Sequence, residues 1–283
     1  MRRVCSIILL ILAALCAGIG IGKYWEERTA GQEYEKLRQE LVTKADAADQ
    51  SAAEPGLTDE TSSESLTEQQ TETEKSEASE AVSEKEPVVI PIDFEALQEL
   101  NPDAYAWIRV DGTQIDYPIV QREGDNTYYL NHTIEGKEAV EGTIFTEDYN
   151  TVDFENPNTV IYGHNMKNGS MFQNLHNYSD KEFFDEHRDV TIYLPDEIRH
   201  YKIFAAYLYD SRHILQSFDF SNEKVVEYYQ SLIFSIRDME SHIDASMEDE
   251  FDKDSKIITL STCYQGMAEK RYLVQAVLVS VEK

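Results

Sequence analysis

A cysteine and an arginine lie eight residues apart near the end of the chain, on either side of a short polar loop. Cys263 ends the apolar run IITLSTC, and Arg271 opens the run RYLVQAVLV after the segment YQGMAEK. Alternating apolar residues around a glycine-containing loop predict a hairpin of two strands. If these strands pair, the thiol and the guanidinium lie at the same end of the hairpin, where the cation can stabilise a thiolate or an oxyanion.

The use of cysteine draws attention to Cys263. The chain has three cysteines, and Cys5 and Cys16 lie in an apolar span where they are interpreted as small packing residues. The remaining thiol is a buried inert side chain, an intermolecular crosslink or a reactive nucleophile. A free thiol is mostly protonated at neutral pH, so the third interpretation requires a nearby base or cation.

Histidine is the usual base in such sites, and the chain has seven histidines. His164 follows the apolar run NTVIY and Gly163, which places it at a strand end, where barrel proteins build sites. Two alternatives remain open, namely Arg271 in a surface salt bridge and Cys263 as a small buried strand residue. The other histidines are interpreted as surface or loop residues, and they are His132, His176, His187, His200, His213 and His242.

These residues lie in a region, 87–283, with the composition of one globular domain that is mainly β. Short β-rich runs alternate with Gly, Asn, Asp or Pro signals, and seven or eight strands predict a barrel or a sandwich. The runs are residues 113–121, 141–149, 158–164, 190–196, 200–210, 255–263 and 270–282.

Helical spacing appears at two places in the same region. A helix with Phe94, Leu97 and Leu100 on one face is expected to end near Asn101, before a strand that begins around Trp107. A longer amphipathic helix is expected at 222–239, between the late strands and before the cysteine strand, because apolar residues recur there at helical spacing after a capping Ser or Asn.

The residues before 87 have a different organisation. Residues 1–3 contain two arginines and precede the uncharged span 4–22, which predicts a single-pass signal-anchor with a cytoplasmic N-terminus and an extracellular domain. A cleaved secretory signal is the alternative. Residues 23–44 predict a juxtamembrane amphipathic helix, and residues 45–86, rich in Glu, Ser, Thr and Ala, predict a disordered acidic linker.

Charge restricts the class of partner. The formal net charge is −29, and residues 87–283, with 16 basic and 36 acidic groups, contribute −20. A domain with this charge is repelled by phosphate backbones, so binding to nucleic acid is disfavoured.

Several motifs in this domain resemble those of the sortase family, and more narrowly class B sortases. They are TLSTC at 259–263, the arginine that opens the following strand, VIYGHNM, GTQIDYPIVQ, DNTYYLNH and EGTIFTEDYN, in the order seen in that family. The helix before the barrel and the long helix before the cysteine strand also resemble class B. The resemblance covers about residues 92–282 and implies an eight-stranded sortase-type β-barrel.

The resemblance also implies roles for individual residues. Cys263 is the expected nucleophile, His164 the expected general acid and base, and Arg271 the group that holds the substrate and steadies the oxyanion. The residues expected to shape the pocket or contact substrate are Ser261, Thr262, Asn126 and Leu130.

The implied activity is that of a cysteine transpeptidase of Gram-positive cell walls. Such an enzyme cleaves a C-terminal sorting signal of secreted proteins through a thioacyl-enzyme and transfers them to a peptidoglycan amine, with no metal or cofactor. Two other functions remain open: a cysteine peptidase that passes the acyl group to water, and a non-catalytic anchored binding module in which Cys263 is structural.

Overall fold

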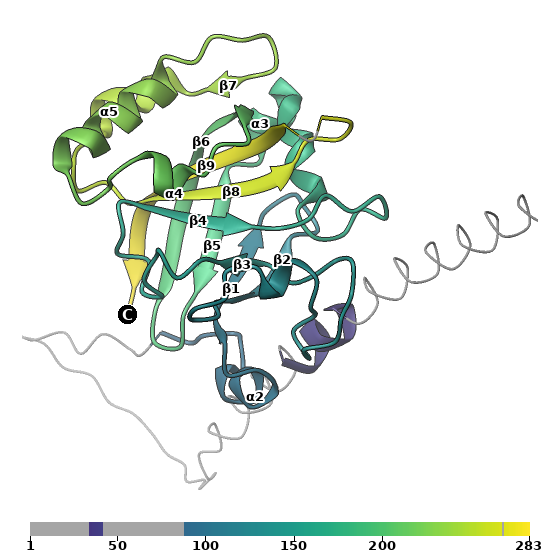
Figure 1. Ribbon diagram of the computed structural model, residues 1–283. Helices are drawn as coiled ribbons and strands as arrows, with labels where there is room; N and C mark the ends of the chain where they lie inside the picture. Colours follow the sequence, from purple (N-terminus) through teal and green to yellow (C-terminus); the bar gives the residue numbers. More distant parts are fainter. Residues whose placement is uncertain (1–33, 42–87, 268) are drawn as a thin grey trace, which may run out of the picture.

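The computed structural model describes residues 34–41, 88–267 and 269–283 (Figure 1). The predicted anchor at 4–22 and the predicted linker at 45–86 lie outside these residues. Among the helices that the structure describes, none combines the length and apolar character needed to cross a bilayer.

The described strands form one sheet that closes into a barrel. The order is β5-β1-β2-β3-β4-β8-β9-β6-β7, and β5 also pairs with β6. The ring therefore has eight strands, with β7 attached to the edge of β6, which confirms the predicted eight-stranded barrel. The strands are β1 Ala104–Val110, β2 Asp116–Val120, β3 Phe145–Thr146, β4 Asn158–Tyr162, β5 Asp189–Tyr193, β6 Ile198–Asp210, β7 His242–Ile243, β8 Ile257–Cys263 and β9 Lys270–Glu282.

Apolar side chains fill the interior of the ring. Trp107 of β1, Leu260 of β8 and Val274 of β9 are fully buried. Along β8 every residue is buried except the last, Cys263. Strand β8 is therefore buried in the core up to Thr262, and the thiol of its last residue is exposed to solvent.

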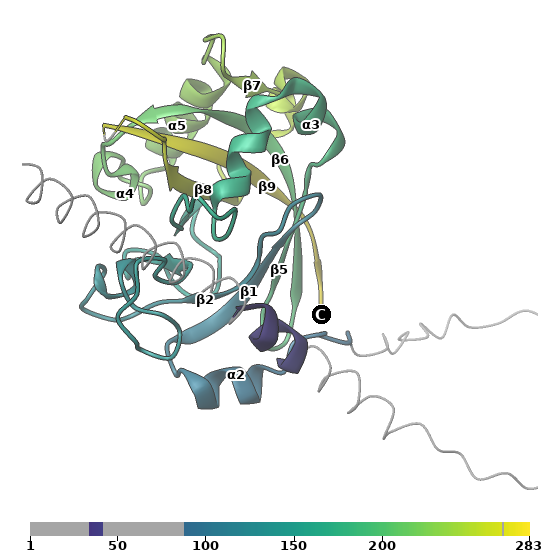
Figure 2. The same ribbon diagram turned by 90° about the vertical axis from the view of Figure 1, so that its right-hand side faces the viewer.

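Helices cover the outside of the barrel and its connections (Figures 1 and 2). Helix α5 packs over β6, β8 and β9 through Tyr229, Ile233 and Phe234, which contact Phe204 of β6 and Leu273 of β9 within one buried cluster. The α-helices are α2 Phe94–Leu100, α3 Lys181–Glu186, α4 Ile214–Ser217 and α5 Glu223–Phe234, and the 3-10 helices are η1 Tyr128–Leu130, η2 Gln173–Ser179 and η3 Ala245–Glu250.

Helix α2 ends beside Asn101 as predicted, but one expected buried position and the end of α5 differ from the prediction. Leu100 is 39% exposed and does not share the buried face of Phe94 and Leu97, because α2 ends at that residue. Helix α5 ends at Phe234, five residues before the predicted end at 239. There the Arg237 side chain donates to the carbonyl oxygen of Phe234, at 2.6 Å, and caps the last turn.

Residues 34–41 form a helix within the predicted amphipathic segment 23–44. It lies on the same side of the barrel as α2 (Figure 2). Tyr34 is buried, and its hydroxyl donates to the carbonyl oxygen of Gly142 at 3.0 Å, while Arg38 pairs with Asp116 at 3.1 Å. The apolar side of this helix therefore packs on the barrel domain.

Candidate active site

The hairpin of β8 and β9 sets the thiol beside the arginine. Its register pairs Cys263 with Arg271, as predicted from the sequence. The thiol is exposed, whereas the arginine is half-buried and donates to the carbonyl oxygen of Lys270 at 3.1 Å. The exposed position argues against the interpretation of Cys263 as a buried inert side chain.

The parallel pairing of β4 with β8 brings the histidine to the same place. Tyr162 of β4 pairs with Ser261, so His164, two residues later, lies level with Cys263. The Gly163 N–H donates to the carbonyl oxygen of Ser261 at 3.1 Å, and the Thr262 hydroxyl donates to the carbonyl oxygen of Gly163 at 2.8 Å. These bonds continue the contact between the strands up to His164.

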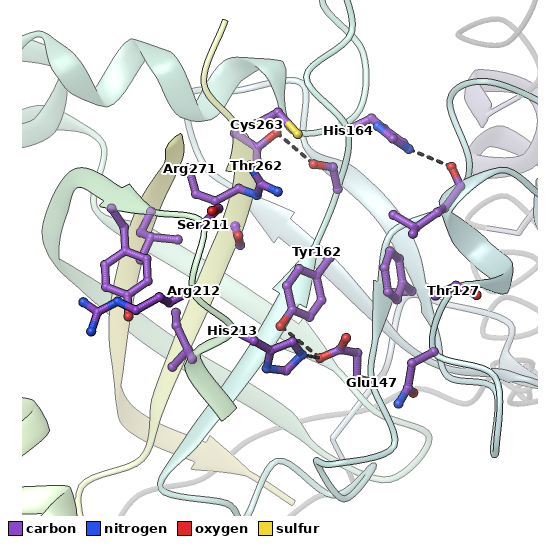
Figure 3. Close-up of a pocket in the computed structure, with 18 residues that line it drawn as sticks. Thr127, Glu147, Tyr162, His164, Ser211, Arg212, His213, Thr262, Cys263 and Arg271 are labelled. Carbon is purple, nitrogen blue, oxygen red and sulfur yellow. Dashed lines mark hydrogen bonds and ion pairs between the residues drawn. The ribbon is translucent and has the colours of Figure 1, made fainter. Parts of the chain in front are cut away.

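The imidazole of His164 is oriented by a backbone carbonyl. Its Nε2 lies 2.7 Å from the carbonyl oxygen of Leu130, which can only accept, so Nε2 carries the proton. Figure 3 shows the side chains of Cys263 and His164 at the same opening, with the imidazole turned toward the Leu130 carbonyl. In the neutral ring Nδ1 is then the unprotonated nitrogen.

The residues that the sequence suggested all line one cavity of about 240 Å³ (Figure 3). The thiol lies at one end of this cavity, and Arg212 and His213 line the other. The seven residues are Asn126, Leu130, His164, Ser261, Thr262, Cys263 and Arg271.

The two residues expected to contact substrate from the opposite rim, Asn126 and Leu130, also bond to the protein itself. The amide of Asn126 exchanges two hydrogen bonds with Asp148, at 2.7 and 2.8 Å, and so ties together two loops at the rim of the cavity. Leu130 exposes 43% of its surface while its carbonyl oxygen accepts from His164. Its apolar side chain therefore remains available to contact a ligand.

A second polar cluster in this cavity was not predicted. His213 Nε2 lies 2.7 Å from Glu147 Oε2, and the Tyr162 hydroxyl donates to the same oxygen at 3.0 Å. Burial, together with the Glu147 charge, raises the pKa of Tyr162, so its hydroxyl stays protonated and donates to the carboxylate. The three residues come from distant segments without a shared motif, and His213 had been interpreted as a surface or loop residue.

Comparisons with known proteins show similarity to sortases. A profile of the sortase domain matches residues 108–279. The chain is 36% identical over 188 residues to sortase B of Listeria monocytogenes, covering 65% of this chain and 73% of that protein.

Solved structures show the same likeness. Sortase B of Bacillus anthracis superposes with a TM-score of 0.58 at 34% identity, covering 69% of this chain and 88% of that one. A sortase B–substrate complex of Staphylococcus aureus superposes with a TM-score of 0.55 at 25% identity, covering 66% and 84% respectively.

The tight space around Gly163 yields a prediction. A Cβ at this position would lie 2.5 Å from Ile144 Cδ1 and 2.6 Å from Phe172 Cγ, and both side chains are fully buried. Because the Phe172 N–H donates to the carbonyl oxygen of His164, the displacement reaches the histidine. We expect Gly163→Ala to lower the stability by about 1–3 kcal/mol.

We also expect this variant to lose about tenfold or more in kcat/KM, because the histidine is displaced. Chemical denaturation and peptide-cleavage kinetics measure the two effects, and the folded baseline of the denaturation curve shows that the assayed variant is folded. Wild-type stability together with wild-type activity would show that the packing around Gly163 does not position His164.

Proposed function

We infer that this chain cleaves a C-terminal sorting signal of secreted proteins and transfers them to a peptidoglycan amine. The chain belongs to the sortase family and to its class B, so it is a cysteine transpeptidase. The observation that carries this proposal is the cavity in which Cys263, His164 and Arg271 meet from adjacent strand ends. The substrate bound in the Staphylococcus aureus complex supports a sorting-signal ligand by analogy.

The proposed first half-reaction is acylation of the thiol. The Cys263 thiol gives its proton to His164, which becomes an imidazolium, and the sulfur attacks the carbonyl carbon of the signal threonine, whose oxygen gains the negative charge of the tetrahedral intermediate. Arg271, paired with Cys263 across the hairpin, and backbone N–H groups stabilise this oxyanion. The C–N bond then breaks, and His164 protonates the leaving amine.

The second half-reaction releases the product. An amine of a peptidoglycan precursor attacks the thioester carbon and loses its proton to His164, and the thiolate leaves. In the structure the Nε2 proton of His164 is donated to the Leu130 carbonyl at the edge of the cavity. When substrate binds beside Leu130, the Nε2 proton of His164 leaves the Leu130 carbonyl oxygen and is donated to the leaving amine of the first half-reaction.

The location of the enzyme is part of the proposal and rests on the sequence. The uncharged span 4–22, preceded by two arginines, supports a single-pass anchor with a cytoplasmic N-terminus. The catalytic domain then faces outward, and the acidic segment 45–86 gives it reach from the membrane surface.

The experiment that tests the proposed reaction is product analysis with and without an amine. The 283-residue chain is incubated with peptides containing N-P-x-T-N or P-x-T-G, alone and with an added amine acceptor. We expect the amine to form a new peptide bond at the threonine and to raise the turnover, since water is the slower acceptor. Release of free acid only, unchanged by amine, would favour a cysteine peptidase.

The arginine yields a second prediction, because lysine keeps its charge but not its planar array of donors. We expect Arg271→Lys to lose about 10²- to 10³-fold in kcat/KM, the usual cost of removing a preorganised oxyanion donor. Thiol labelling of Cys263 should persist in this variant. Activity within threefold of the wild type would make Arg271 a structural residue, since a partly exposed ion pair is nearly satisfied by lysine.

A further inference from the structure

The peptide group that follows the nucleophile is bonded at both of its edges. The Asn165 Nδ2 donates to the carbonyl oxygen of Cys263 at 3.0 Å. On the opposite edge, the Tyr264 N–H donates to the carbonyl oxygen of Lys270 at 3.2 Å. Because a peptide group is planar, bonds at both edges fix its orientation and with it the direction of the Cys263 side chain.

The Asn165 side chain provides a hydrogen bond to the β8 backbone at a position where β4 no longer pairs with β8. The ladder between β4 and β8 ends at the pair Tyr162 and Ser261, two residues before Cys263. Beyond this point the amide of Asn165 reaches back to the β8 backbone. The side chain thus satisfies a carbonyl oxygen at the exposed end of the strand, where fraying would otherwise move the thiol.

Asn165 is in turn oriented by His176 of η2. The Asn165 Nδ2 lies 2.8 Å from His176 Nε2, and that ring nitrogen also lies 3.1 Å from the carbonyl oxygen of Cys263. An amide nitrogen carries two hydrogens and no acceptor. If one hydrogen is donated to the carbonyl oxygen and the other to Nε2, the imidazole is neutral and carries its proton on Nδ1. A proton on Nε2 would instead be donated to the Cys263 carbonyl oxygen and would exclude the bond from Asn165.

The surroundings of His176 favour this neutral form. Burial lowers the pKa of His176, because the charged ring would lose its hydration. Its ring packs against Tyr272 at 5.2 Å and Tyr264 at 5.6 Å between centroids. The backbone of Asn165 is fixed as well, by a bridge to Met171.

We propose that Asn165 and His176 are positioning residues of the transpeptidation, which hold the Cys263–Tyr264 peptide so that the thiol faces the cavity. This inference rests on the proposed function. Neither residue touches the reacting atoms, and both act through the backbone of the nucleophile. Their contribution is therefore to the rate of acylation after substrate has bound, and not to substrate affinity.

Matched variants of the 283-residue chain test this role. Asn165→Ala removes both hydrogen bonds, and we expect about a tenfold lower kcat for peptide acylation with KM unchanged. His176→Phe keeps the aromatic packing but removes the acceptor, and about a fivefold loss is expected. His176→Gln restores an acceptor for the Asn165 amide, which should return kcat to within about threefold of the wild type.

His200→Gln is the control, because His200 lies at the surface of β6 and pairs with Glu282. The thiol should still be alkylated to completion in the Asn165→Ala variant, and its melting temperature should stay within a few degrees of the wild type. These results would show that the loss of kcat does not reflect an unfolded domain or a hidden thiol.

The protonation state of His176 gives a readout that needs no substrate. In long-range proton–nitrogen correlation spectra of the ¹⁵N-histidine-labelled chain, the resonances missing from His176→Gln identify this ring. We expect protonated Nδ1 and unprotonated Nε2 at neutral pH. A proton on Nε2, or a wild-type kcat in Asn165→Ala, would overturn the proposal. An inactive wild-type chain would instead contradict the proposed function, so the two failures are distinguishable.

Discussion

The parallel pairing of β4 with β8 is the contact on which the site depends. It joins segments that are 99 positions apart, as the hydrogen bond from Thr262 to Gly163 shows. Because the pairing is in register from Asn158 to Tyr162, the residues that follow β4 arrive beside the last residue of β8. A slip of one residue would turn His164 to the other side of the sheet and away from the thiol.

Because of this pairing and the β8–β9 hairpin, a cation, an imidazole and an amide all lie beside the end of β8. The hairpin with β9 supplies the cation, the segment after β4 supplies the histidine, and the same segment supplies the amide of Asn165. The thiol itself is left exposed at the end of a buried strand. In the proposed reaction, Arg271 lies where negative charge develops, within a domain whose net charge over 87–283 is −20.

The parts that sequence reasoning anticipated are local or repetitive. The pairing of Cys263 with Arg271 follows from a short hairpin. The strand pattern predicted a barrel or a sandwich, and the resemblance to sortases implied the eight-stranded barrel that the structure has. His164 was distinguished from the other histidines by its place after a strand and by the sortase-like motif around it. The clusters of Glu147 with His213 and of Asn165 with His176 were not anticipated, because they arise from tertiary contacts between loops without local periodicity.

The central claim is that Cys263 carries the acyl group between donor and acceptor. Its most direct test is mass spectrometry of the 283-residue chain, quenched in acid during turnover of a sorting peptide without amine, and then digested. The fragment containing Cys263 should gain the mass of the peptide up to its threonine, and added amine should remove this adduct. Cleavage of the peptide with no adduct on Cys263, or with the adduct on another residue, would contradict the account.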